Sequence, residues 1–257
     1  AAHGAHAPPQ ALVGKDLRWI SQGQKLSRPM AANVALDAAR GQYCIFLDDD
    51  DLIAPQHIEK LVHALQRNPE ACAAHTDVQV LDMNGKELLR YDRPFCAQRL
   101  IGSNVFPIHS VLFARSLVTL LGCRFDEALP VLEDWDFWLQ VSEHSTFIHV
   151  PGVSAIYRYR DRSALQNSAH VHHQAKWRAM VYSKWLNRWP QQNVADALAW
   201  YAAQLDHGEQ SLDHARKKYA VQAEQWQQTL HRLEAAVSAA RAQAEDAYVA
   251  MQRAQHE

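Results

Sequence analysis

Apolar and polar residues alternate along the first part of the chain with the spacing of short helices and strands. The Ser-Arg-Pro sequence at 27–29 is typical of a helix start, and that helix is expected to end at Gly41. The apolar run 43–47 predicts a strand, and a second amphipathic helix is expected to begin near Pro55. This order is a strand–loop–helix unit, whose loop follows the carboxyl end of the strand.

The middle of the chain predicts a hairpin and then a mixture of strands and helices. Val78–Leu81 and the segment 87–91 are expected to pair around Asn84-Gly85, a strong turn sequence. The other expected elements are a strand at 17–20, a segment over 110–121 that begins as a strand and turns helical, a helix opening at 133–139, and two strands, 146–150 and 153–159, separated by Pro151-Gly152.

From about residue 165 onward the hydrophobic pattern is helical throughout. Trp177, Val181, Trp185 and Trp189 recur every fourth residue, Pro190 is expected to end that helix, and a further helix covers 194–205. From Trp226 to Met251 the apolar intervals alternate between four and three, which predicts a coiled coil and a homo-oligomer through residues 219–251. The alternative is a long amphipathic helix packed on its own domain.

These patterns divide the chain into four segments. We expect an irregular segment at 1–16, an α/β domain at 17–165, a helical extension at 166–208 and a coiled-coil helix at 209–257.

Composition and charge exclude several classes of protein. Hydrophobic residues are 48% and charged residues 21% of the 257, so the chain is not disordered. The net charge of −2 provides no global basic field, and we expect no nucleic-acid partner. The four cysteines show no CxxC spacing, which suits a reducing compartment, and no apolar run is long enough to predict a transmembrane segment. We expect a cytoplasmic protein, with a peripheral position at the inner membrane also open.

Four consecutive carboxylates, Asp48 to Asp51, follow the strand predicted at 43–47. They repel one another, and a divalent cation would offset that repulsion. If the strand continued, Asp48 and Asp50 would point the same way and could hold Mn²⁺ or Mg²⁺. Leu52 and Ile53 exclude an EF-hand loop, and Leu52 also excludes a DxDxT nucleophile loop. A solvated acidic loop that caps the following helix remains the alternative.

A second acidic pair, Glu133-Asp134, opens an aromatic helical stretch. Burial beside tryptophans would tune the pKa of such a carboxylate for general-base work, and helix N-capping is the alternative. Arg158 and Arg160 lie on one face of a predicted strand, where two guanidinium groups suit a diphosphate. The alternative there is a pair of surface arginines.

The order of these motifs resembles a family 2 glycosyltransferase of the GT-A type, from about Leu17 to Ser163. The segments that carry the resemblance are 33–41, 46–51, 122–127, 132–139 and 157–158. The resemblance implies a Rossmann-like mixed sheet, followed here by the helical region, and a nucleotide-sugar donor.

The resemblance also assigns roles to individual residues. Asp48 and Asp50 fall on the family's metal-binding DXD motif, with Mn²⁺ or Mg²⁺ as the ion, and Asp134 falls on the catalytic base. Inversion at the anomeric carbon is implied. Donor-binding candidates are Asp48, Asp49, Asp50, Arg158, Arg160 and Asn33, and acceptor-site candidates are Glu133, Trp135 and His109.

The sequence also departs from the family pattern. The opening strands and the Pro-Thr-Tyr-Asn-like turn are absent, so we expect an N-terminally truncated domain. Ala32 stands where the family has an arginine, with Arg28 one turn earlier, and Arg160 stands where relatives carry a metal-binding histidine. Two hypotheses follow. One is a metal-dependent inverting transferase that acts on a glycan or lipid-linked acceptor in bacterial cell-surface glycan synthesis. The other is a non-catalytic scaffold that oligomerises through its helical tail.

Overall fold

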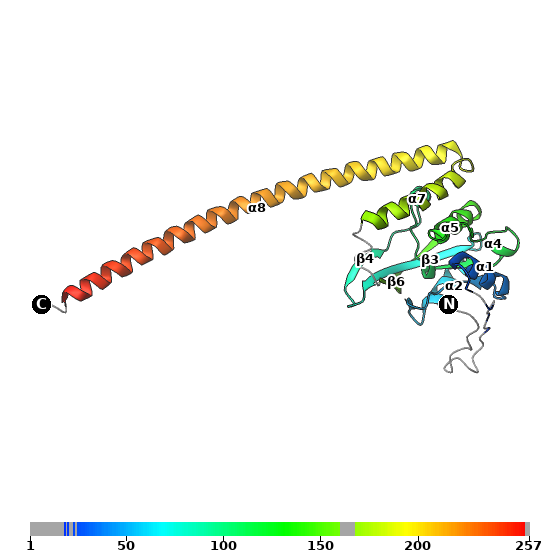
Figure 1. The fold of residues 1–257 in the computed structure, drawn as a ribbon, viewed down its shortest axis with the longest axis horizontal. Coiled ribbons are helices and arrows are strands. Elements are labelled where there is room, and N and C mark those ends of the chain that lie inside the picture. Colours follow the sequence, from blue (N-terminus) through cyan, green and yellow to red (C-terminus); the bar gives the residue numbers. More distant parts are fainter. Residues whose placement is uncertain (1–17, 19, 21–22, 24, 160–167, 255–257) are drawn as a thin grey trace. The chain divides into compact units, whose positions relative to one another are not determined.

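The computed structural model describes residues 18, 20, 23, 25–159 and 168–254 (Figure 1). The chain divides into two compact units, residues 1–200 and 201–257.

A mixed sheet lies at the centre of the first unit, with strand order β1-β5-β3-β6-β2 and with β4 paired to β3. The β3–β6 pair is parallel, and the other described pairs are antiparallel. The strands are β1 (Tyr43–Cys44), β2 (Leu52–Ile53), β3 (Ala73–Asp82), β4 (Glu87–Tyr91), β5 (Val111–Ala114) and β6 (Phe147–Tyr159).

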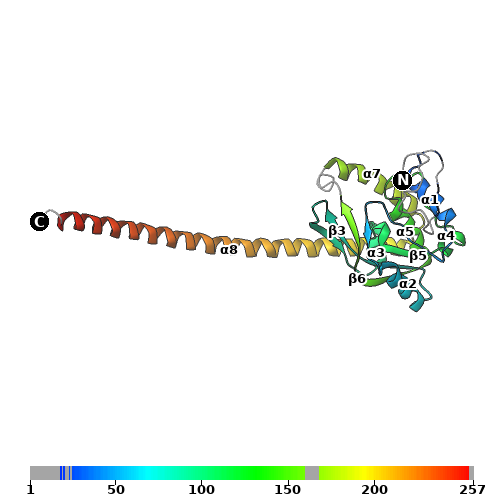
Figure 2. The same ribbon diagram turned by 90° about the horizontal axis from the view of Figure 1, so that it is seen from below.

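Helices cover both faces of this sheet, as Figures 1 and 2 show. The helices of this unit are α1 (Arg28–Ala38), α2 (His57–Arg67), α3 (Ala97–Gly102), α4 (Ser116–Thr119), α5 (Glu133–His144), α7 (Ser168–Trp185) and the first turns of α8 (Gln191–Ala254), with a 3₁₀ turn at Ile108–Ser110. Successive strand residues point to opposite faces of a sheet, so neighbouring residues enter different cores. Ala74 and Leu112 pack with α2, whereas Ala73 and Phe113 pack in the larger core with α1, α3, α4, α5 and α7.

A buried carboxylate ties α7 to α5. Asp136 is fully buried and accepts hydrogen bonds from Lys184 Nζ at 2.9 Å, Trp185 Nε1 at 2.7 Å and Gln140 Nε2 at 2.9 Å. A buried charge is tolerated when it is paired and hydrogen-bonded in this way. The contact anchors α7 beside the helix that carries Glu133 and Asp134.

The mixed α/β fold predicted from the sequence is confirmed, as are several of its elements. Ser27 is the N-cap of α1, with its Oγ 3.4 Å from the Met30 amide. The β3–β4 hairpin forms, and Gly85 adopts φ 77° in its turn. The strand-to-helix change is seen at β5 and α4, and α5 begins at Glu133.

Other expectations about elements need correction. The strand expected at 43–47 ends at Cys44, and α1 ends at Ala38, three residues before Gly41. The two strands expected around Pro151-Gly152 are one strand, β6, which shifts register against β3 at this point. Leu17 and Trp19, from the strand expected at 17–20, lie outside the described residues.

The second unit consists of the remainder of α8, a single helix that continues from Gln191 to Ala254. The helix expected over 194–205 and the helix of the tail are therefore continuous. No helix in the described part of the chain combines the length and apolar character that a membrane crossing needs. All four cysteines are free thiols.

Candidate active site

A polar cleft of about 450 Å³ lies in the first unit and brings together side chains from segments far apart in the sequence. It is bounded by the start of α1, the acidic loop after β1, the start of α5 and the ends of β4 and β6. Seven of the residues named from the sequence line it: Arg28, Asp48, Asp51, His109, Glu133, Asp134 and Trp135.

Arg28 connects the two acidic motifs across this cleft. Its Nη2 lies 2.6 Å from Asp48 Oδ2, and its Nε lies 3.2 Å from Glu133 Oε1. One guanidinium group therefore joins the acidic loop to the start of α5. The sequence had shown Arg28 only as a helix-start residue and as a displaced family arginine, because a contact over 105 positions has no local signal.

The acidic loop is held from behind by its last carboxylate. Asp51 is 6% exposed, and it accepts a hydrogen bond from the Arg158 amide at 3.1 Å. Its Oδ2 lies 2.9 Å from Nδ1 of the buried His109, while the Arg158 Nε donates to the Asp50 carbonyl. The expectation that Asp48 and Asp50 point the same way depended on the strand continuing through them. The strand ends at Cys44, so extended-strand geometry does not align these two side chains. A turn takes its place, in which the Asp51 amide donates to the Asp48 carbonyl.

The acidic loop does not cap the next helix. Between the loop and α2 lies the strand β2, and Gln56, the N-cap of α2, makes no side-chain capping hydrogen bond. The capping part of that alternative is therefore wrong, and the exposed Asp49 still fits a solvated loop.

The second acidic pair opens α5 after a residue in an unusual backbone conformation. Leu132 has φ 63° and ψ 17°, in the left-handed region that branched residues seldom adopt. Strain of this kind is typical of functional sites, where the surrounding structure fixes the backbone. Here it sets the direction of the first turn of α5, with Glu133 and Asp134 at the cleft.

Burial changes the acidity of both carboxyl groups in this pair. Glu133 is 4% exposed, and burial, followed by the nearby charge of Asp134, raises its pKa to about 7. Burial also raises the pKa of Asp134, against the opposing influence of Arg28. Asp134 is fixed by Asn104, whose Nδ2 donates to its Oδ2 at 2.7 Å, and by the Trp135 amide at 2.8 Å. The first turn of α5 therefore presents carboxyl groups that take up protons more readily than free ones.

The remaining predicted site residues lie deeper or elsewhere. Trp135 is 1% exposed, and its Nε1 donates to the Leu100 carbonyl at 2.6 Å, so it anchors α5 to α3. Asn33 is not among the described residues that line the cleft; its side chain holds both the amide and the carbonyl of Phe125. Asp49 is exposed on the loop, and Arg160 lies outside the described residues.

Two of the cleft's polar residues had no signal in the sequence. Asn104 and Arg178 also line it, and Arg178 lies 6.0 Å from the centre of the Trp135 ring. Both belong to segments with no recognisable motif, and only the fold brings them into this cleft.

The side chains of the acidic loop suit a metal that arrives with its substrate. Among the residues that the structure describes, no group of three or more acidic, histidine or cysteine side chains could hold a cation. Mg²⁺ is commonly held by one or two carboxylates together with substrate phosphates, and Asp48 and Asp50 would supply the carboxylates. The Asp48 side chain is 39% exposed, so a phosphate-bound ion can reach it.

Comparison with known proteins relates part of the domain that carries this cleft to a known family. Residues 10–112 match the sequence model of glycosyl transferase family 2. This segment of the chain is similar to a glycosyltransferase family 2 domain. The match ends before α5, so Glu133 and Asp134 fall outside it. The N-terminal truncation of the domain stays a prediction.

The individual proteins that this chain resembles are distant relatives. An uncharacterised glycosyltransferase of Methanocaldococcus jannaschii is 27% identical over 129 residues, covering 49% of this chain and 44% of the relative. An uncharacterised glycosyltransferase of Bacillus subtilis is 28% identical over 147 residues, covering 54% of this chain and 53% of the relative. Among solved structures, the chain superposes on a mannosyltransferase from Pyrobaculum calidifontis in complex with GDP-Man and Mn²⁺, with a TM-score of 0.42 and 16% identity. The superposition covers 74% of this chain and 63% of the mannosyltransferase chain. The chain spans about half the length of the curated relatives it matches.

Proposed function

We propose that this family 2 domain is a metal-dependent, inverting glycosyltransferase. It moves a sugar from a nucleotide-sugar donor to a hydroxyl group of a glycan or lipid-linked acceptor, in bacterial cell-surface glycan synthesis. The observation that carries the proposal is the pairing of Asp48 and Glu133 through Arg28 in the cleft that also contains Asp134. This pairing brings a partly exposed carboxylate loop and a more deeply buried carboxylate pair to one substrate-sized space.

The acidic loop forms the donor side of this proposal. Asp48 and Asp50 would hold Mn²⁺ or Mg²⁺ together with the donor diphosphate, and the ion would act as a Lewis acid for the departing nucleoside diphosphate. Arg28 contributes a second positive charge beside Asp48, where the diphosphate would lie. Asp51, His109 and Arg158 position the loop through the contacts described above.

The first turn of α5 forms the acceptor side. The acceptor oxygen attacks the anomeric carbon, the bond from that carbon to the diphosphate oxygen breaks, and the hydroxyl proton passes to the Asp134 carboxylate. One displacement of this kind inverts the anomeric configuration. A base works best when its pKa lies near the working pH, and burial moves the pKa of Asp134 upward in that direction. Asn104 orients the accepting carboxylate.

Turnover of nucleotide sugars tests this assignment. The full chain is incubated with Mn²⁺ and a panel of UDP- and GDP-sugars, and release of nucleoside diphosphate is measured. Asp134→Asn should lower the rate by about 10²- to 10⁴-fold, the usual contribution of a positioned base, and should leave nucleotide binding intact. The exposed Asp206→Asn on α8 is the matched control.

Two results would contradict the assignment. Full activity in Asp134→Asn would exclude Asp134 as the base. A chain that binds no nucleotide with or without the metal would instead favour the non-catalytic scaffold.

A further inference from the structure

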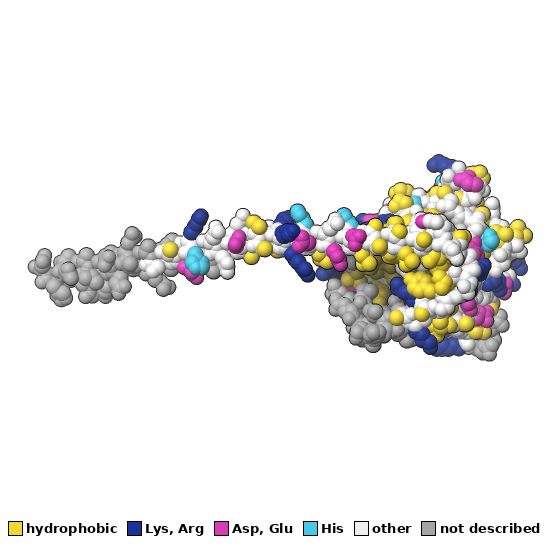
Figure 3. Space-filling model, turned by 90° about the horizontal axis from the view of Figure 1, so that it is seen from above, with side chains coloured by type: hydrophobic (Ala, Val, Ile, Leu, Met, Phe, Trp, Pro, Cys, Tyr) yellow, Lys and Arg dark blue, Asp and Glu magenta, His cyan; other side chains and the backbone are white. Residues whose placement is uncertain are grey.

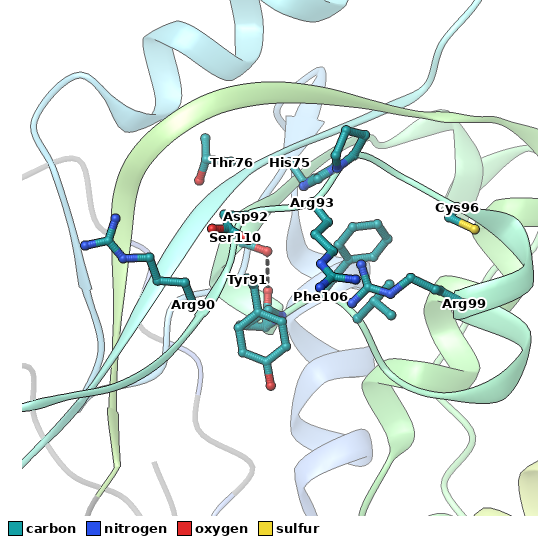
Figure 4. Close-up of a pocket in the computed structure, with 13 residues that line it drawn as sticks. His75, Thr76, Arg90, Tyr91, Asp92, Arg93, Cys96, Arg99, Phe106 and Ser110 are labelled. Carbon is teal, nitrogen blue, oxygen red and sulfur yellow. Dashed lines mark hydrogen bonds between the residues drawn. The ribbon is translucent and has the colours of Figure 1, made fainter. Parts of the chain in front are cut away.

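A second hollow lies beside the cleft of the first unit, between the end of β4 and residues 105–107 (Figure 4). Its volume is about 40 Å³, the space of roughly a few water molecules, which leaves no room for a sugar ring. A partner larger than a few atoms therefore needs another surface. The second unit provides one along α8.

Large apolar side chains form a row along the part of α8 that belongs to the second unit, and Figure 3 shows hydrophobic side chains along this helix. They recur at every seventh residue and are 61–74% exposed: Leu205, Leu212, Tyr219 and Trp226. Three residues before each of them stands an exposed residue that is small or charged: Ala202, Glu209, Arg216 and Ala223. Residues three and four apart lie on one face of a helix, so these eight side chains form a single seam.

The seam matches a second copy of itself when the two helices run in opposite directions. In a parallel pair each residue meets its own copy, so layers of two alanines leave space while Tyr219 and Trp226 crowd against their copies. In an antiparallel pair centred at the level of His214, the layers are Ala202 with Trp226, Leu205 with Ala223, Glu209 with Tyr219, and Leu212 with Arg216. Every layer then combines a large apolar side chain with a small or a flexible one, which fills the interface evenly.

The two charged residues of the seam favour the same orientation. Glu209 and Arg216 are seven residues apart, about 10.5 Å along the helix, so they cannot reach one another within one chain. In the antiparallel pair Glu209 lies about 4.5 Å along the axis from the partner's Arg216, within reach of the two long side chains. In a parallel pair each of them would face its own copy, and like charges in one layer repel.

The other charges near the centre of the seam are compatible with antiparallel pairing. Three acidic residues in 206–213 precede three basic residues in 216–218, so each acidic segment lies beside the basic segment of the other copy. Asp213 would lie near its own copy. Lys217 offsets that charge from within the same helix, with its Nζ 2.7 Å from Asp213 Oδ2.

We propose that α8 is a docking surface for a second copy of this chain, and that the two seams pair in antiparallel orientation with Glu209 beside the partner's Arg216. A closed two-fold pair results, in which each copy gives and receives the same contacts. The proposal is independent of the transferase function, because none of the seam's residues is among the described residues that line the cleft.

Charge reversal tests the orientation through sedimentation equilibrium of the full chain. Glu209→Arg alone, or Arg216→Glu alone, should raise the dissociation constant of the dimer at least tenfold, because each places like charges side by side. Both substitutions together should restore the natural value. Glu224→Arg, which reverses an exposed glutamate outside the seam, should leave it unchanged. Circular dichroism should show the same helix content in every variant.

A parallel pair predicts a different outcome. Each single reversal would leave like charges facing one another, as in the natural chain, and the dissociation constant would not change. Single variants that dimerise as the natural chain does, or a natural chain that sediments as one copy of 29.2 kDa, would overturn the proposal.

Oxidative cross-linking determines the direction without changing a charge. A mixture of Leu205→Cys and Ala223→Cys chains should form a disulfide between the two introduced positions, identified by peptide mass. The natural chain, with its four free thiols, is the control for other cross-links. A disulfide that joins position 205 to position 205, or none between 205 and 223, would overturn the antiparallel pair.

Discussion

At the scale of single residues, Arg28 holds the site together and also competes with a metal. Its guanidinium lies 2.6 Å from Asp48 Oδ2, the carboxylate that would meet the cation. A positive charge at that distance opposes the binding of a second one. The site should therefore accept a metal more readily when a diphosphate arrives to share the positive charges.

Removal of this arginine should expose the competition. Without nucleotide present, Arg28→Met should bind Mn²⁺ several-fold more tightly than the natural chain, because Asp48 loses its ion-pair partner. Electron paramagnetic resonance of free Mn²⁺ measures the affinity. Arg40→Met, which removes an exposed arginine, is the control. Unchanged or weaker Mn²⁺ binding in Arg28→Met would show that the arginine does not compete at Asp48.

The raised pKa of Glu133 makes a prediction about stability. Its pKa rises from 4.5 in the unfolded chain to about 7 in the fold. Between those values the folded chain keeps a proton that the unfolded chain releases, so this group's contribution to stability falls as the pH rises from about 4.5 to about 7. Glu133→Gln abolishes the titration. Its unfolding free energy relative to the natural chain should increase across that window by about 3 kcal/mol at most.

Urea unfolding at pH 5 and pH 8 measures this change. Glu59→Gln, which removes an exposed carboxylate from α2, is the matched control. If the difference between Glu133→Gln and the natural chain were the same at both values of pH, the Glu133 carboxyl would not titrate in this range.

Residue identities could be predicted from the sequence where a local motif carries them. The acidic run and the Glu133-Asp134 pair are motifs of adjacent residues, and the structure places members of both in one cleft. The partners that control them are Arg28, Asn104 and His109. Arg28 and Asn104 reach the carboxylates from distant segments, and no motif marks these contacts. His109 contacts Asp51, the last residue of the acidic loop.

At the scale of elements, the start of α5 depends on one strained residue. Leu132 combines a left-handed backbone with partial burial against the core. Glycine adopts this conformation without the steric penalty of a side chain, about 1–2 kcal/mol for other residues. Backbone strain and side-chain packing therefore act in opposite directions at this position.

Two substitutions separate these effects. Leu132→Ala and Leu132→Gly both lose the packing of the leucine, and only glycine relieves the backbone. Leu132→Gly should therefore be more stable than Leu132→Ala by about 1 kcal/mol in urea unfolding. At the exposed Gln66 in α2 the order should reverse, with alanine better by about 1 kcal/mol. An alanine preference at both positions would mean that Leu132 is not strained.

Elements defined by local patterns were predictable, and those defined by contacts were not. The β3–β4 hairpin follows from its turn sequence. The continuity of β6 could not be predicted from local sequence, because it depends on contacts with β3. Asp77 on β3 accepts a hydrogen bond from the Gly152 amide at 2.7 Å, and its Oδ1 lies 2.6 Å from His149 Nε2. That carboxylate supports the strand across the Pro151-Gly152 interruption. The four-residue spacing of apolar residues from Trp177 to Trp189 predicted α7. The hydrogen bond from Trp185 to Asp136, which attaches α7 to α5, depends on tertiary structure.

At the scale of the whole molecule, α8 carries a regular row of exposed hydrophobic side chains. They recur at every seventh residue and are 61–74% exposed: Leu198 67%, Leu205 70%, Leu212 61%, Tyr219 69% and Trp226 74%. Figure 3 shows hydrophobic side chains along the described part of the helix, with charged ones between them. A heptad row of this kind is typical of a helix that pairs with another. The row begins earlier in the chain than the segment 219–251, for which pairing was predicted.

Charge placed in this row should separate the copies. The natural chain should form a dimer or higher oligomer, and Leu205→Glu with Leu212→Glu should reduce the mass to the 29.2 kDa of one chain by light scattering. His207→Glu with His214→Glu adds the same charges about 200° around the helix and should leave the oligomer intact. A natural chain of 29.2 kDa at the same concentration would contradict the coiled-coil prediction.

The proposed transferase requires the Arg28-bridged cleft to bind a nucleotide through a metal held at the acidic loop. Calorimetric titration of UDP and GDP into the full chain, with and without Mn²⁺, tests it most directly. One of the two nucleotides should bind only with Mn²⁺, Asp48→Asn should abolish that dependence, and Asp206→Asn on α8 should behave as the natural chain. Nucleotide binding that is equal with and without Mn²⁺, or unchanged in Asp48→Asn, would show that no metal at the acidic loop holds the nucleotide.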